Sequence, residues 1–126
     1  MVKHGWIDAK PHANKRLGAY CTKLPATRTP LVFMTWSGSR SDLMTLAHEL
    51  GHAFHNWVIR DLPLCQTYYP MTLAETASIF AENIVRDHLI SKAESVDEKL
   101  EMLWEELSSA LALMVEGCPH HPGLIR

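Results

Sequence analysis

The sequence lacks a long apolar run, a large excess of charge of either sign and a paired set of cysteines. Without an apolar run near 18 residues, no transmembrane helix is expected. The N-terminus also lacks the charged, apolar and small-residue order of a signal peptide. The formal net charge is −2 and Lys and Arg are scattered, so there is no basic stripe for nucleic acid or an anionic membrane. We expect a cytoplasmic protein with neither partner.

The cysteines are too few and too widely spaced for a disulfide framework. Cys21, Cys65 and Cys118 are odd in number and form no C-x-x-C pair, which favours reduced thiols. The chain has 126 residues, of which 47% are hydrophobic and 21% charged. This composition is typical of a globular chain of at most one domain.

One segment carries a pattern typical of a metal site. It reads His48-Glu49-Leu50-Gly51-His52, within a helix predicted from Ser41 to about Arg60. Residues four apart share one edge of a helix, so His48 and His52 present two imidazoles together. Zinc accepts neutral imidazole, and catalytic sites usually have three protein ligands. In this pattern Glu49 is predicted to be the general base of a zinc hydrolase.

A chance match is the alternative, because the chain is rich in His and Glu. The rest of the helix argues against it. Its apolar residues form a predicted stripe nearly opposite the two histidines, made of Leu43, Leu46, Ala47, Leu50, Ala53, Phe54 and Trp57. The histidine edge is therefore expected to face solvent or a cleft. His55 projects in another direction, and we expect it at the rim or behind the ligands.

A third ligand is sought downstream, in a helix predicted from near Thr72 to about Ser91. Glu75 lies on its polar side, and a carboxylate from a following helix would complete a His₂Glu zinc site. A second interpretation is open, because Thr72-x-x-Glu75 is also a capping-box pattern. The rival ligands are Glu82, Asp61 and Cys65.

Two residues share the helical edge of Glu75. Ser78 and Glu82 follow it at i+3 and i+7, so they could orient the ligands through hydrogen bonds.

The remaining segments predict an α+β fold that is mainly α. Short β-like pieces at Gly5–Asp8 and Leu17–Cys21 suggest a hairpin. The run Leu31–Trp36 is the best strand, either a core strand or an exposed edge that accepts an extended peptide. A third, packing helix is predicted over Ser95–Glu116, with one apolar face. The expected order is a small N-terminal β-sheet, the HExxH helix, an antiparallel ligand helix and the packing helix.

The run Thr45–His55, TLAHELGHAFH, followed by Ala74–Asn83, AETASIFAEN, strongly resembles the M3 family of zinc oligopeptidases, in particular its oligoendopeptidase F branch. Gly5–Asp8, Arg16–Tyr20 and Leu31–Trp36 resemble the family's segments just upstream of its zinc helix. The resemblance implies zinc ligands at the positions of His48, His52 and Glu75, one Zn²⁺ per chain, and a general base at Glu49.

The implied activity is that of a metalloendopeptidase acting on short peptides. An alternative is a non-catalytic zinc-binding helical module that needs a complementary chain. Family members are several times longer and carry a later segment with His and Tyr residues thought to stabilise the oxyanion. Each missing donor would reduce the rate by about 10²–10³.

After Val115 the sequence does not continue the family pattern. We therefore expect residues 1–115 to be a partial M3-type catalytic core and residues 116–126 a divergent, disordered tail. Short peptides are the expected substrates, and the missing remainder of the peptidase domain is the expected further partner.

Overall fold

The computed structural model describes residues 1–116, with side chains to residue 111. The predicted tail therefore lies outside the described residues, apart from residue 116. The chain divides into two compact units, Met1–Asp87 and a second that begins at His88. Within the described part of the chain, no helix is both long and apolar enough to cross a membrane.

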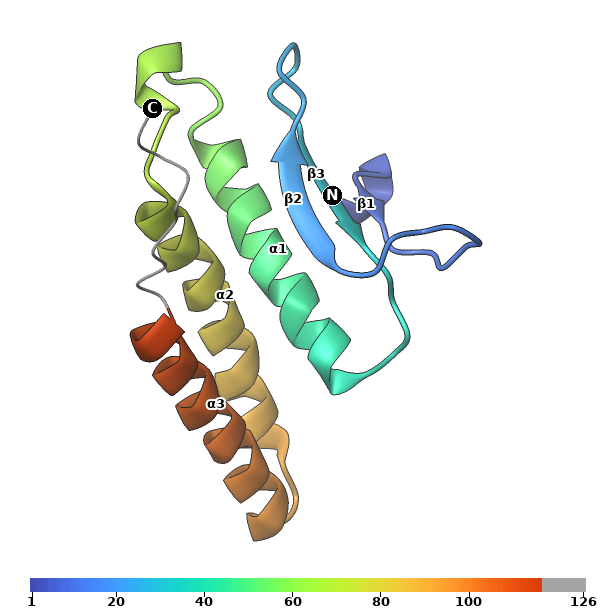
Figure 1. The fold of residues 1–126 in the computed structure, drawn as a ribbon, viewed down its shortest axis with the longest axis vertical. Helices are drawn as coiled ribbons and strands as arrows, with labels where there is room; N and C mark the ends of the chain where they lie inside the picture. Colours follow the sequence, from blue (N-terminus) through green and yellow to red (C-terminus); the bar gives the residue numbers. More distant parts are fainter. Residues whose placement is uncertain (117–126) are drawn as a thin grey trace. The chain divides into compact units, whose positions relative to one another are not determined.

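The first unit begins with a 3-10 turn, η1 (Val2–His4), and a three-stranded sheet (Figure 1). Its strands are β1 (Ile7–Asp8), β2 (Ala19–Lys23) and β3 (Pro30–Met34), in the order β1-β3-β2. β3 pairs in parallel with β1 and antiparallel with β2.

The sheet order corrects one prediction and decides another. The predicted hairpin of the first two β pieces is wrong, since β3 lies between them. β3 has a partner on both sides, so the edge-strand interpretation is wrong and the core interpretation is confirmed. The physical reason is burial: Val32 and Met34 are 2% and 1% exposed, and the most apolar strand takes the central position.

Helix α1 (Arg40–Val58) follows β3 and begins at a capping box formed by Ser39 and Asp42. The Ser39 hydroxyl accepts the Asp42 N–H at 3.0 Å, and the Asp42 carboxylate accepts the Ser39 N–H at 3.1 Å. Hydrogen bonds from Ser37 to the same carboxylate hold the pKa of Asp42 well below its usual range. Satisfying these donors fixes where the helix starts.

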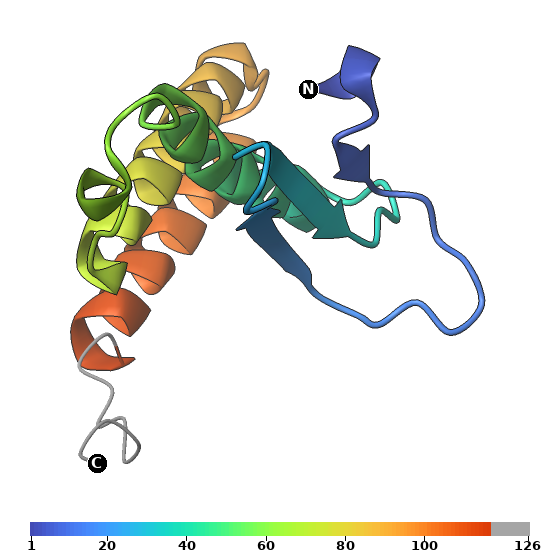
Figure 2. The same ribbon diagram turned by 90° about the horizontal axis from the view of Figure 1, so that it is seen from above.

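The predicted apolar stripe of α1 is only partly buried. Ala47 and Ala53 are buried, whereas Phe54 is 68% exposed. Glu49, Gly51 and the polar Asn56 are buried instead. The helix lies against β2 and β3 on one side (Figure 2) and against α2 on another. Each of these two contact faces is narrow, so the residues on it must be small or hydrogen-bonded.

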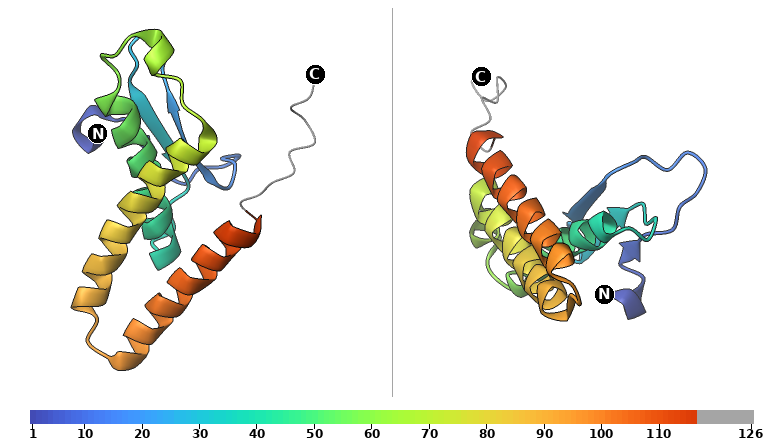
Figure 3. Two further views of the ribbon diagram at one scale, coloured as in Figure 1. Left: turned by 90° about the vertical axis from the view of Figure 1, so that its left-hand side faces the viewer. Right: turned by 90° about the horizontal axis from the view of Figure 1, so that it is seen from below.

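Helix α2 (Met71–Lys92) follows a connection that contains the 3-10 turn η2 (Leu64–Gln66). Its first turns run antiparallel to α1 (Figure 3, left), since His52 lies near Glu75 and His48 near Glu82. The antiparallel ligand helix is thus where the sequence predicted it. Its observed bounds extend one residue beyond the predicted ones at each end.

The second unit contains the end of α2 and helix α3 (Val96–Glu116). The Ser95 hydroxyl accepts the Glu98 N–H at 3.1 Å and caps the start of α3. Met102 is buried at 4% exposure. The apolar face predicted for packing is instead largely exposed, as at Val96, Leu100, Leu103, Leu107 and Leu111.

Candidate metal centre

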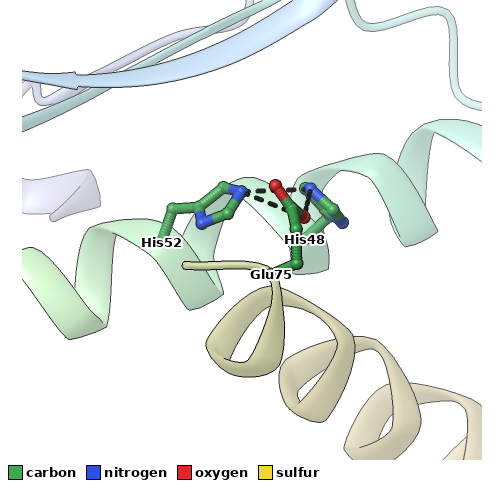
Figure 4. Close-up of side chains that lie close together, drawn as sticks. All are labelled: His48, His52 and Glu75. Carbon is green, nitrogen blue, oxygen red and sulfur yellow. Dashed lines mark hydrogen bonds and ion pairs between the residues drawn. The ribbon is translucent and has the colours of Figure 1, made fainter. Parts of the chain in front are cut away.

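Two histidines of α1 and a glutamate of α2 converge on one point (Figure 4). The Nε2 atoms of His48 and His52 lie 3.1 Å apart. Glu75 Oε2 lies 3.3 Å from the first and 3.7 Å from the second. A tetrahedral zinc site with bonds of 2.0–2.1 Å places its ligand atoms about 3.3–3.4 Å apart. The three atoms therefore have the spacing that one such ion requires.

The close approach of the two helices brings Glu75 to the histidines. A Cβ added at Gly51 would lie 2.5 Å from the main-chain oxygen of Ala77 and 2.7 Å from the Cα of Ser78. Ser78 is fully buried, and its hydroxyl donates to the Glu75 carboxylate at 2.9 Å. Gly51 thus permits the contact, and Ser78 orients the carboxylate.

The capping-box interpretation of Glu75 is wrong. Helix α2 begins at Met71, and the N–H groups of Leu73 and Ala74 bond to the oxygen of Pro70 at 3.0 and 3.2 Å. Thr72 therefore lies inside the helix and is not its N-cap residue. The Glu75 carboxylate is free to face the histidines.

Glu82 supports His48 from behind. His48 Nδ1 lies 2.6 Å from Glu82 Oε1, which is a hydrogen-bonded ion pair when the imidazole is charged. A proton held on Nδ1 leaves the Nε2 lone pair facing Glu75. The hydrogen bond to Glu82 raises the pKa of His48, whereas burial lowers the pKa of His52.

Glu49 lies about 100° round α1 from His48 and faces β2, close enough for the charges of His48 and Glu75 to act on it. It is 6% exposed, and its carboxylate lies beside the main-chain N–H of Cys21. Burial raises the pKa of Glu49, and the positive charge of His48 lowers it in part. Its Oε2 atom is buried without a hydrogen-bond partner among the described residues. A buried carboxylate oxygen without a partner is a group able to accept a proton.

A layer behind Glu49 and His52 was not predicted. Asn56 donates to the His52 main-chain oxygen at 3.0 Å and accepts the Tyr69 hydroxyl at 3.0 Å. Burial and the charge of Glu49 raise the pKa of the Cys21 thiol to about 11. Asn56 follows His52 at i+4, a signal that was available, but nothing in the local sequence pairs Cys21 or Tyr69 with α1.

Of the rival ligands, Glu82 contacts His48 through Nδ1 and is not in the group of three, whereas Asp61 and Cys65 lie outside the cluster. Asp61 pairs with Arg60 at 3.2 Å and is exposed, and Cys65 is an exposed free thiol. The ring of His55 packs on Tyr69, with centroids 4.4 Å apart, and its Nδ1 is buried without a partner in the described part of the chain. The structure thus gathers His48, His52 and Glu75 and leaves these three residues apart.

The family of this chain follows from its similarity to known proteins. Residues 1–116 match the model of Peptidase family M3. The chain belongs to this family. Within M3, it is 35% identical over 105 residues to the chromosomal oligoendopeptidase F of Lactococcus lactis subsp. cremoris, covering 82% of this chain and 17% of that protein.

Two further similarities agree with the M3 assignment. The chain is 30% identical over 103 residues to oligopeptidase PepF of Bacillus subtilis (strain 168), covering 81% of this chain and 15% of that protein. It also resembles a crystal structure from Chlamydophila abortus that is assigned as a peptidase. The TM-score is 0.76 at 31% identity, over 86% of this chain and 18% of that one. The M3 chain described here thus spans about one sixth of the curated relatives it matches.

Proposed function

We propose that this chain carries the zinc centre of an M3 peptidase that hydrolyses peptide bonds in short peptides. The observation that carries the proposal is the convergence of His48, His52 and Glu75, with ligand atoms 3.1–3.7 Å apart, in a chain of family M3. The names oligoendopeptidase and oligopeptidase of two relatives support short peptides as substrates. The cytoplasmic location and the absence of nucleic-acid and membrane partners remain predictions.

Three residues would hold one Zn²⁺: His48 and His52 through Nε2, and Glu75 through a carboxylate oxygen. When bound, zinc would polarise the scissile carbonyl and lower the pKa of water toward about 7. Two imidazoles and one carboxylate are a donor set typical of catalytic rather than closed structural sites. Ser78 and Glu82 hold Glu75 and His48 in position through their hydrogen bonds.

Glu49 takes a proton from the attacking water and returns it to the leaving amine. Its burial and its unpartnered Oε2 support this role. A raised pKa also suits a carboxylate that must hold the proton briefly.

The test compares Glu49→Gln with the parent chain in zinc content and in cleavage of a quenched fluorescent peptide. The variant should keep zinc and lose about 10²–10⁴-fold in rate, because the amide cannot accept the proton. Glu101→Gln, at an exposed glutamate of α3, is the matched control. Unchanged turnover in Glu49→Gln would remove this residue from the mechanism.

A second candidate is a non-catalytic zinc-binding helical module that pairs with a complementary chain. One observation favours it: several large apolar side chains are exposed, namely Phe54, Phe80, Ile84, Leu100 and Trp104. Zinc titration followed by thermal unfolding, with and without peptide, separates the candidates. Strong stabilisation by zinc without hydrolysis supports the module.

A further inference from the structure

A cavity of about 320 Å³ lies at the far end of β2, beside the last turns of α1 and the connection that contains η2. Three cationic residues line it, Lys23, Arg28 and Arg60, and we call it the cationic pocket. Asn56 and Thr67, which are buried, also line it. Its apolar lining includes Leu24, Ile59 and Leu64.

The positive charge of the cationic pocket is largely uncompensated. Lys23 Nζ donates to the main-chain oxygen of Thr67 at 3.4 Å. Arg28 Nη1 donates to the main-chain oxygens of Arg60 and Leu62 at 2.7 and 2.8 Å. Among the described residues, no carboxylate lies within 4.0 Å of either cation. These carbonyl dipoles hold the cations in place but do not neutralise them.

The third cation is only weakly compensated. Arg60 pairs with Asp61 at 3.2 Å, but that carboxylate is 81% exposed, so water screens the pair. Lys23 and Arg28 also retain unused N–H donors, since an ammonium has three and a guanidinium five. The pocket therefore offers charge, free donors and an apolar wall to an organic anion.

Two elements place the cationic pocket next to the metal-ligand cluster. Along β2, Lys23 lies two residues beyond Cys21, whose main chain lies beside Glu49. Two strand residues span about 6.6–6.8 Å, and their side chains lie on the same face. Along α1, Asn56 lies four residues beyond His52, a helical rise of about 6 Å. The Asn56 side chain donates to the main-chain oxygen of His52. An extended peptide covers such a distance in about two residues.

We propose that the cationic pocket is a subsite for a carboxylate of the peptide substrate, about two to three residues from the scissile bond. The carboxylate comes from the free C-terminus or from an acidic side chain. Both sources offer the same anion on a carbon chain that suits the apolar wall. This inference rests on the proposed peptidase function and names a feature of its substrates.

The test records backbone amide shifts of the full metal-free chain by NMR, so it needs neither zinc nor turnover. One arm compares N-acetyl-leucine with N-acetyl-leucinamide, for the C-terminus. The other compares N-acetyl-glutamic acid α-amide with N-acetyl-glutamine amide, for the side chain. In at least one arm the acid should bind roughly fivefold to tenfold more tightly than its neutral partner, with shifts centred on Lys23, Arg28 and Asn56.

Matched variants localise the effect. Lys23→Gln, and independently Arg60→Gln, should remove the preference for the acid, whereas Lys10→Gln, at an exposed lysine outside the pocket, should keep it. Equal binding of acid and neutral probe in both arms, or a preference that survives both pocket variants, would overturn the inference. Shifts caused by inorganic phosphate and by neither carboxylate would overturn it as well.

The outcome is separable from that of the proposed function. If the acid probes bind as expected and Glu49→Gln leaves turnover unchanged, the subsite stands and the assigned base does not. If Glu49→Gln abolishes turnover and the probes show no preference, the subsite is wrong and the peptidase proposal stands.

Discussion

The side of α1 that faces the sheet differs from the side that faces α2. Toward the sheet, Glu49 is 6% exposed and lies beside the main chain of Cys21. Toward α2, the side chains of His48 and Glu75 are 29% and 34% exposed and lie 3.3 Å apart. The H-E-x-x-H spacing turns the glutamate about 100° from the first histidine. One helix can therefore place a desolvated carboxylate against the sheet and, beside it, two more accessible histidines toward α2.

The largest expected effect is a difference in zinc affinity between two variants, Glu75→Gln and Glu49→Gln. Glu75→Gln should lower the affinity roughly 10²–10³-fold, because one of three ligands is lost. Glu49→Gln should change it by no more than about threefold, since Glu49 is not one of the proposed ligands. Competition with a chromophoric chelator measures both. Equal losses would mean that the two sides are not distinct.

The second prediction concerns the thiol on the sheet side. With a pKa of about 11 instead of 9.0, Cys21 holds about 100-fold less thiolate at pH 8 than an unperturbed cysteine. Iodoacetamide should therefore modify Cys21 far more slowly than exposed Cys65, as followed by peptide mapping. Reaction of Cys21 should accelerate in Glu49→Gln, since a neighbouring negative charge is removed. Comparable modification rates for both cysteines in the parent chain would contradict the conclusion that the side of α1 facing the sheet is desolvated.

The third prediction concerns the support behind His48. Glu82→Gln should lower zinc affinity about 10–100-fold, because the amide holds the imidazole less firmly and does not favour its Nδ1 proton. The same chelator competition measures this, with Glu101→Gln as control. An unchanged affinity would mean that the 2.6 Å contact does not orient the ligand.

The smallest effect tests the contact between α1 and α2. An alanine in the middle of a helix normally stabilises by about 0.5–1 kcal/mol over glycine. At Gly51 the added Cβ meets the Ala77 oxygen at 2.5 Å, and overpacking costs about 1–3 kcal/mol. Gly51→Ala should therefore lower the unfolding free energy of the metal-free chain in urea. A more stable variant would show that the helices need not approach so closely.

Local chemistry made the helices predictable. Ser39 and Asp42 form the capping box that their spacing indicates, and α2 and α3 begin within one residue of the predicted positions. The zinc-ligand roles of His48, His52 and Glu75 stay predictions, although the three side chains do converge. Helical periodicity fixes which residues share an edge, so it could bring the two histidines together without knowledge of the fold.

Contacts between distant segments explain the errors. The apolar stripe of α1 is predicted from the periodicity of one helix alone. The sheet and α2 instead pack on two sides of the helix and bury only part of this stripe, and Phe54 of the stripe stays exposed. The hairpin failed because β3 takes the place between β1 and β2. In the same way, the partners of Lys23 and Arg28 lie more than 30 residues away in the chain, so no local pattern could place them in one pocket.

The sequence by itself determined the metal-ligand motif, the helix starts and the family resemblance, because each depends on residues a few positions apart. Only the tertiary structure decided that Glu75 faces the imidazoles instead of capping its helix, that Glu49 is desolvated against β2, and that three cations share one cavity. Those outcomes depend on how closely α1 approaches the sheet and α2. The approach to α2 is set by packing at Gly51 and Ser78, which no periodicity encodes.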